Sequence, residues 1–88
     1  MHAVVTHVTV KDRDKAIETL GNEVVPGVSQ APGFVAGYWV SPQPDKGVGI
    51  VVFESEEAAK AAAERVGARP GDEVTMDSVE VGEVVANA

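Results

Sequence analysis

The sequence predicts an α+β fold in which four strands form one antiparallel sheet and two helices cover a single face of it. Three observations support this fold class. Short runs rich in β-branched residues recur along the chain, two longer segments space apolar residues as helices do, and the resulting order is βαββαβ. That order is one ferredoxin-like unit. The chain has 88 residues and no internal linker, so we expect a single domain over residues 1–88.

The first half of the chain is predicted to form a strand and an interrupted helix. Residues 3–10 are short and β-branched, and a charged cluster ends them. From about 13 to 31, apolar residues fall at i, i+3, i+7 and i+11 on one helical face, and Asp12 or Asp14 is placed to cap it. Two glycines and Pro26 interrupt this segment, so we expect a kinked or broken helix.

The second half is predicted to supply three more strands and the second helix. Pro32-Gly33 is a turn signal, and a proline-rich loop at 42–47 joins the next two strands as a hairpin. Ser55 is placed to cap an alanine-rich helix whose first turn carries two glutamates, where negative charge suits the helix dipole. The predicted elements are strands at 34–41, 48–54 and 74–85, a helix from Ser55 to Gly67, and a loop with Pro70-Gly71 before the last strand.

Composition excludes several classes of function. The chain has no cysteine, which rules out disulfides, zinc–thiolate sites and thiol nucleophiles. Its 14 acidic and 7 basic residues give a net charge of −7, which repels nucleic-acid phosphates and anionic lipid. No apolar run approaches the roughly 18 residues of a membrane span, and the N-terminus lacks a secretory signal pattern. We therefore expect a cytoplasmic protein with no nucleic-acid partner and no membrane association.

Both faces of the predicted sheet are apolar. In the strand at 34–41, Phe34, Ala36, Tyr38 and Val40 share one face, and the other face is also free of polar residues up to Trp39. An antiparallel sheet with helices on one side normally alternates apolar with polar residues. Since the helices cover only one face, a second copy of the chain is the simplest cover for the other, which predicts a homodimer. The alternative is a monomer with a few exposed apolar side chains, as many proteins have.

His7 is the best single candidate for a catalytic residue. It lies in the middle of the first strand, and a neutral imidazole near pH 7 acts as a base or as a haem ligand. Its parity groups it with Ala3, Val5 and Thr9, on the less apolar face of that strand. The alternative is a packing histidine that bonds a neighbouring hydroxyl or the backbone. Which sheet face it occupies stays open, because a one-residue slip in register inverts the face.

The second strand holds three of the four aromatic residues, and we expect any ligand there. Tyr38 and Trp39 are adjacent, so they point to opposite faces of the sheet. Each ring can stack on a flat ligand and offer one hydrogen bond, and together with Phe34 they are the predicted substrate-binding residues. The alternative is ordinary core or interface packing.

The acidic residues near the C-terminus do not predict a metal site. Five of them follow position 70, and no histidine lies near them in the sequence. A carboxylate metal site needs converging oxygens or an imidazole. We expect a solvated acidic edge that discourages strand-to-strand aggregation.

Three segments of the chain together carry a resemblance to a known family. They are the run APGFVAGYW at 31–39, the central strand at 48–53 and the run FESEEAA at 53–59. In order and spacing the chain resembles the dimeric α/β-barrel proteins of the antibiotic biosynthesis monooxygenase-like (ABM-like) superfamily. The resemblance implies a ferredoxin-like fold that dimerises sheet to sheet into an α/β barrel. These motifs have structural roles, because Gly33 makes a turn, Phe34 enters the core and Ser55 caps a helix.

The resemblance also narrows the function. Such proteins include cofactor-independent monooxygenases of aromatic substrates, haem-degrading enzymes and small isomerases. Haem-degrading members carry a polar first-strand residue, usually Asn, with an aromatic residue and a histidine on the second helix. Here that helix has neither Trp nor His, and the first strand offers His7 and no Asn, so haem degradation is disfavoured. We expect a cofactor-independent monooxygenase acting on an apolar or aromatic small molecule without metal or flavin. The alternative is a non-catalytic dimeric module for ligand binding or interaction.

Overall fold

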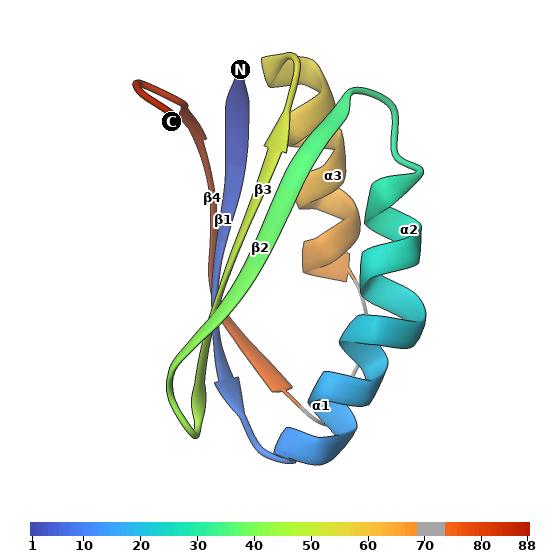
Figure 1. The fold of residues 1–88 in the computed structure, drawn as a ribbon, viewed down its shortest axis with the longest axis vertical. Coiled ribbons are helices and arrows are strands. Elements are labelled where there is room, and N and C mark those ends of the chain that lie inside the picture. The colour runs from blue at the N-terminus through green and yellow to red at the C-terminus, as the bar shows by residue number, and fades with distance from the viewer. Residues whose placement is uncertain (69–73) are drawn as a thin grey trace.

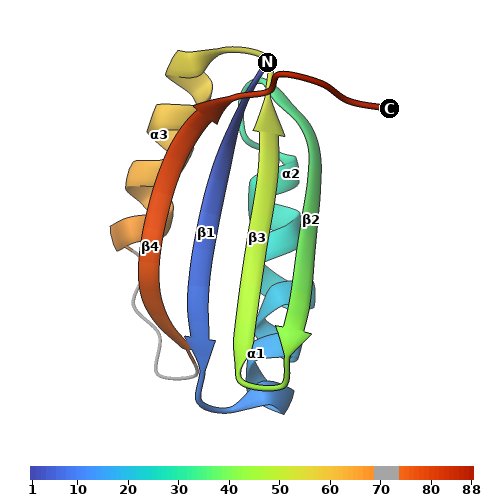
Figure 2. The same ribbon diagram turned by 90° about the vertical axis from the view of Figure 1, so that its left-hand side faces the viewer.

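A computed structural model describes residues 1–68 and 74–88, so the predicted loop at 70–71 lies outside the described residues. The four strands form one antiparallel sheet in the order β2-β3-β1-β4. The described helices all lie on one face of it (Figure 1), and Figure 2 shows the other face uncovered. None of these helices is long and apolar enough to cross a membrane. The predicted fold class is confirmed, with the elements β1 (His2–Val10), α1 (Arg13–Thr19), η1 (Leu20–Val24), α2 (Val25–Ser29), β2 (Phe34–Gln43), β3 (Lys46–Phe53), α3 (Glu56–Ala68) and β4 (Val74–Glu83).

The first helix is continuous where the sequence predicts an interruption. Asp12 caps it, because its side chain accepts a hydrogen bond from the backbone N–H of Lys15 at 3.1 Å. The interruption takes the form of η1, a π-helical turn in which the N–H of Val25 donates to the carbonyl of Leu20. Pro26 lacks an N–H, and in an α-helix its ring would clash with the carbonyl four residues earlier. We attribute the wider π turn just before Pro26 to relief of that clash, so the helix is altered and not broken.

The hairpin between β2 and β3 is tighter than the predicted loop at 42–47. The two strands pair as far as Gln43 and Lys46, which leaves a turn of two residues between them. The Ser41 hydroxyl lies within hydrogen-bond distance of the carbonyls of Gln43 (2.7 Å) and Lys46 (3.1 Å). Pro42 is tolerated inside β2 because β2 is an edge strand, whose outer side needs no N–H donor.

The hydrophobic core lies between α3 and the sheet. Ser55 caps α3 by accepting from the N–H of Ala58 at 3.2 Å, as predicted. Small side chains let the helix approach closely, and Ala59 has no exposed surface. Gly33 makes the predicted turn with a φ of 80°, a conformation that favours glycine. The buried cluster consists of Val4, Val51, Phe53, Ala59 and Ala62.

The sheet has one helix-covered face and one open face. A bulge between Phe34 and Ala36 shifts the parity of β2 at its start. Phe34 therefore packs edge-on against Phe53 on the helix-covered side, with ring centroids 6.3 Å apart, and the prediction that it shares a face with Tyr38 is wrong. The apolar character predicted for the other face is confirmed for β2 and β3, where Tyr38 and Ile50 are 65% and 37% exposed. The strands β1 and β4 place the polar residues His7 and Glu80 on that face.

We predict that Phe53→Ala strongly destabilises the fold. The side chain is only 1% exposed, and deleting a buried phenylalanine ring costs about 3–5 kcal/mol in lost burial and cavity formation. Urea unfolding followed by circular dichroism measures the free energy of unfolding. Val85→Ala is the control, because Val85 is 90% exposed and its truncation removes no packing. An unchanged midpoint for the Phe53 variant would contradict the described core.

Candidate ligand cavity

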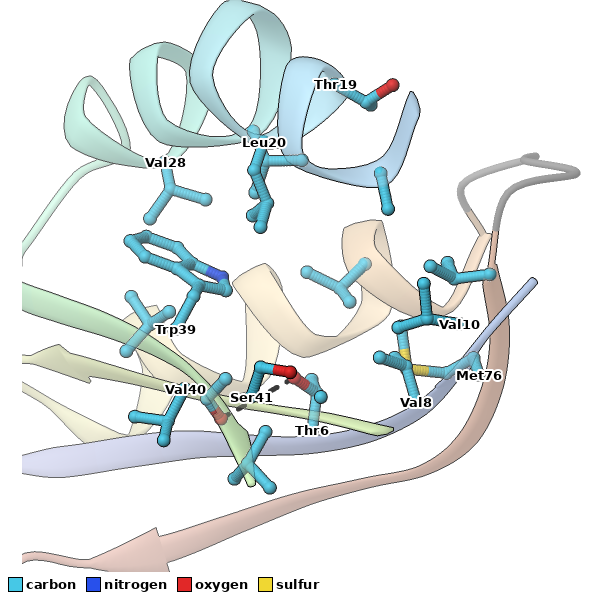
Figure 3. Close-up of a pocket in the computed structure, with 18 of the residues that line it drawn as sticks. Thr6, Val8, Val10, Thr19, Leu20, Val28, Trp39, Val40, Ser41 and Met76 are labelled. Atoms are coloured by element: carbon cyan, nitrogen blue, oxygen red, sulfur yellow. Dashed lines mark hydrogen bonds between the residues drawn. The ribbon is translucent and has the colours of Figure 1, made fainter. Parts of the chain in front are cut away.

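A cavity of about 590 Å³ lies between the helix-covered face of the sheet and the helices. Its volume falls within the range of roughly 300–1,000 Å³ that is typical of small-molecule sites. All four strands contribute to its lining, and most of the side chains around it are aliphatic (Figure 3). The sheet therefore carries a packed core under α3 and an open space under the first helix. Apolar lining residues include Val4, Val8, Val10, Leu20, Val24, Val28, Trp39, Val51 and Met76.

The indole of Trp39 lies along the sheet because two glycines leave it room. A Cβ atom at Gly37 would lie 2.8 Å from the Trp39 ring. One at Gly49, on the neighbouring strand, would lie 3.3 Å from the indole nitrogen and 2.6 Å from the Thr6 hydroxyl. Any side chain at either glycine would push the ring away from the sheet. The ring thus forms part of the cavity wall beneath Val28 (Figure 3).

The first helix stands away from the sheet and leaves the cavity unfilled. No residue of α1, η1 or α2 is buried, whereas α3 buries Ala59 and Ala62. The π turn contributes Leu20 and Val24 to the lining, and π turns inside helices are frequent at functional sites. The aliphatic side chains on the sheet below are mostly valines, which are too short to close the gap.

Two polar groups of the cavity wall have hydrogen-bonding capacity to spare. The indole nitrogen of Trp39 is turned toward the cavity interior (Figure 3), and no described residue accepts a hydrogen bond from it. The hydroxyl of Thr6 makes one long hydrogen bond, 3.5 Å to the carbonyl of Gly49. Thr19 also lines the cavity, but its hydroxyl points away from it (Figure 3). The N–H of Trp39 is therefore available to a ligand, and the Thr6 hydroxyl can accept a hydrogen bond or give up its long bond to Gly49 to donate one.

The charged part of the lining lies near the β2–β3 hairpin. Arg13 donates from Nη1 to the hydroxyl of Ser41 at 2.9 Å and to the carbonyl of Pro44 at 3.4 Å. Lys46 donates from Nζ to the hydroxyl of Thr9 at 3.0 Å. The described lining contains no histidine, aspartate or glutamate. Within residues 1–68 and 74–88, no cluster of three or more such side chains is placed to hold a metal ion.

Of the four predicted site residues, only Trp39 lines the cavity. His7 is exposed on the open face, and Tyr38 lies on that face too. Phe34 is on the helix-covered side, where it packs against Phe53 in the core and does not line the cavity. The catalytic role of His7 and the binding role of Tyr38 stay predictions, and they now concern the open face.

The predicted site residues include none of the five polar residues in the described lining, which are Thr6, Arg13, Thr19, Ser41 and Lys46. A signal for Thr6 was present, because it alternates with Val4 and Val8 and is the polar member of that strand face. Arg13 has no such signal. Its contact with Ser41 joins residues 28 positions apart and exists only once the hairpin packs beside α1.

Comparison with known proteins identifies the same fold in two solved structures. No protein-family model and no curated protein matches the sequence. A mutant of MhuD with two manganese protoporphyrin IX bound per active site is 20% identical, with a TM-score of 0.68, and the match covers 100% of this chain and 98% of that one. The haem-degrader MhuD from Mycobacterium tuberculosis, with two haems in its active site, is 22% identical, with a TM-score of 0.55 over 97% and 98% of the chains. The chain therefore has the ferredoxin-like fold of MhuD over its whole length, as the ABM-like resemblance predicted.

We predict that Gly49→Ala displaces the Trp39 indole and destabilises the protein by about 1–3 kcal/mol, the usual cost of forcing an extra methyl group into a packed site. Trp39 is the only tryptophan, so its emission wavelength reports the displacement directly. Gly21→Ala is the control, because a Cβ there meets nothing within 4 Å and alanine favours a helix. If the Gly49 variant and the wild type have the same stability and the same emission wavelength, the described position of the Trp39 ring is refuted.

Proposed function

We propose that this protein binds an apolar aromatic small molecule in the cavity and oxygenates it there without metal or flavin. The supporting observation is the Trp39 indole, which presents to a mostly aliphatic cavity an N–H donor that no described residue accepts from. Indole is a large, rigid surface for stacking, and its donor fixes the orientation of an oxygen on the ligand. The fold shared with an oxygenase is consistent with this proposal. A cytoplasmic location, expected from the composition, is part of it.

The ligand of MhuD is haem, and the cavity described here offers little to bind its iron. Histidine, cysteine and tyrosine are absent from the described lining, and Met76 supplies the only soft donor atom. Haem iron in proteins is commonly held by His, Cys or Tyr, with methionine usually paired with a histidine. The donor set therefore does not fit haem, and we infer a metal-free aromatic ligand.

The proposed reaction requires an aromatic substrate with an activated carbon, such as the CH₂ group of an anthrone. That carbon loses two hydrogens and becomes a carbonyl. One oxygen atom of O₂ enters the product, the other leaves as water with the two hydrogens, and the substrate supplies all four electrons. When the CH₂ group of the substrate loses its first proton, negative charge is delocalised onto the oxygen atom attached to the ring. The N–H of Trp39 is available to stabilise that oxygen, as a donor of an oxyanion hole does, and the Thr6 hydroxyl would add a second donor by turning from the Gly49 carbonyl.

A non-catalytic binding protein is the second candidate, and one observation favours it. Because the described lining lacks histidine and carboxylates, no side chain there acts as an ordinary general base near pH 7. Oxygenation in this cavity thus depends on a substrate acidic enough to ionise without one. Turnover with such a substrate separates the two candidates.

We predict that Trp39→Phe lowers kcat/KM for an anthrone or hydroquinone at least about tenfold, because it removes the donor while keeping an aromatic ring. Oxygen consumption with a panel of these substrates measures the rate. His7→Ala should leave the rate within twofold of wild type, since His7 lies on the open face and does not line the cavity.

The opposite pattern, with loss of turnover in the His7 variant alone, would move the reaction to the open face. No oxygen consumption with any substrate, combined with saturable binding of the same compounds, would favour the non-catalytic role. Absence of both turnover and binding would refute the proposal.

We also propose that the open face pairs with a second copy of the chain to form the homodimer of an α/β barrel. The face presents Tyr38, Val40 and Ile50 with 65%, 54% and 37% of their surfaces exposed. Contiguous apolar patches of this kind on a small domain usually mark an interface. A self-complementary sheet face is suited to two-fold pairing.

We predict a species of about twice the 9.1 kDa chain mass in sedimentation velocity at micromolar concentration. Ile50→Asp should dissociate it, because the substitution buries a charge in the proposed interface. Val85→Asp introduces the same charge on the C-terminal tail, outside the sheet, and should leave the mass unchanged. A wild-type protein that sediments as a monomer would rule the homodimer out.

A further inference from the structure

The charge of the cavity lining is opposite to that of the chain. The protein has twice as many acidic as basic residues, yet the only charged side chains in the described lining are Arg13 and Lys46. Cations beside an aliphatic cavity, without a matching carboxylate in its wall, favour an anionic group on whatever binds there.

The acceptors that position Arg13 within the described part of the chain are neutral. Its Nη1 atom bonds the Ser41 hydroxyl and the Pro44 carbonyl, both of which are uncharged. Among the described residues no carboxylate lies within 4.0 Å of the guanidinium. The guanidinium is thus held at the cavity without an ion-pair partner among the described residues.

The unused part of the guanidinium has the shape of a carboxylate receptor. Both hydrogen bonds of Arg13 start from Nη1, so no described residue accepts from Nε or Nη2. These two nitrogens form one edge of the planar guanidinium, and their parallel N–H bonds match the two oxygens of a carboxylate.

Lys46 is less suited to this role. Its ammonium donates to Thr9, and the Thr9 hydroxyl in turn bonds the carboxylate of Asp77 at 2.7 Å. An acid therefore lies one hydrogen bond beyond the Thr9 partner of Lys46, whereas no carboxylate of the described residues lies within 4.0 Å of the Arg13 guanidinium. Arg13 is therefore the better candidate of the two for binding an anionic group.

The spacing of residues along β2 places the side chain that contacts Arg13 close to Trp39. Ser41 follows Trp39 by two residues, which corresponds to about 7 Å along a strand, and both line the cavity. A ligand whose rings rest against Trp39 therefore brings a substituent attached directly to the ring into the neighbourhood of Arg13.

We propose that the ligand of this cavity is an aromatic carboxylate, with its rings against Trp39 and its carboxylate on the free edge of Arg13. This inference rests on the proposed function, because it uses the same cavity, and it specifies the chemical class of the molecule bound there. It does not depend on whether the ligand is then oxygenated.

The test compares 1-pyrenecarboxylate with its neutral analogue 1-pyrenecarboxamide, which has nearly the same size and shape. Binding is measured by quenching of Trp39, the only tryptophan in the chain. Wild-type protein should bind the acid at least about tenfold more tightly than the amide, as expected for a charge-assisted bidentate pair. Arg13→Gln should abolish that preference by weakening the acid alone, and Arg13→Lys should retain part of it because it keeps the charge and loses the fork.

Arg65→Gln is the matched control, since it removes one positive charge from an exposed position of α3 outside the cavity lining. It should change neither affinity. Equal binding of acid and amide by the wild type, or an equal loss of both in Arg13→Gln, would overturn the carboxylate inference and leave the proposed aromatic site intact. Failure of both compounds to bind would overturn the inference together with the proposed function.

Discussion

The cavity depends on one contact, the packing of the Trp39 indole against the sheet. Tryptophan has the largest side chain in a chain whose apolar residues are mostly valine and alanine, and a ring that stood up from the sheet would occupy the space itself. Because Gly37 and Gly49 have no Cβ, the ring settles low across two strands. It then forms a wall of the cavity and does not fill it. The orientation of its N–H, and through it the chemistry open to a ligand, follows from those two glycines.

The helix α3 packs closely against the sheet, and the first helix does not. The alanines of α3 bring that helix close enough to bury Ala59 completely, and the packed core forms there. The first helix buries none of its residues and carries a π turn ahead of Pro26. A small domain has little hydrophobic area to spare, so an unfilled space under one helix lowers its stability. A bound ligand or a partner subunit would offset that loss.

Electrostatics distinguish the cavity from the rest of the molecule. The net charge of −7 sets a field that disfavours anions at a distance, but charges separated by more than about 10 Å are largely screened at physiological ionic strength. At contact distance the guanidinium of Arg13, which has no ion-pair partner among the described residues, outweighs that field. In the proposed complex the aliphatic walls and Trp39 accept the rings, and Arg13, one of the two cations in the described lining, accepts the acid.

The element order, the cap at Ser55, the turn at Gly33 and the apolar character of the open face follow from the sequence alone, because each rests on local preferences or on the period of a strand. Which side chains meet was decided by the tertiary structure. One bulge moved Phe34 to the other face, and the pairing of β1 placed Thr6, not His7, beside the cavity. The contact of Arg13 with Ser41 likewise joins distant segments. Since side chains alternate with a period of two, the face of each residue depends on strand register, and only the packed sheet sets that register.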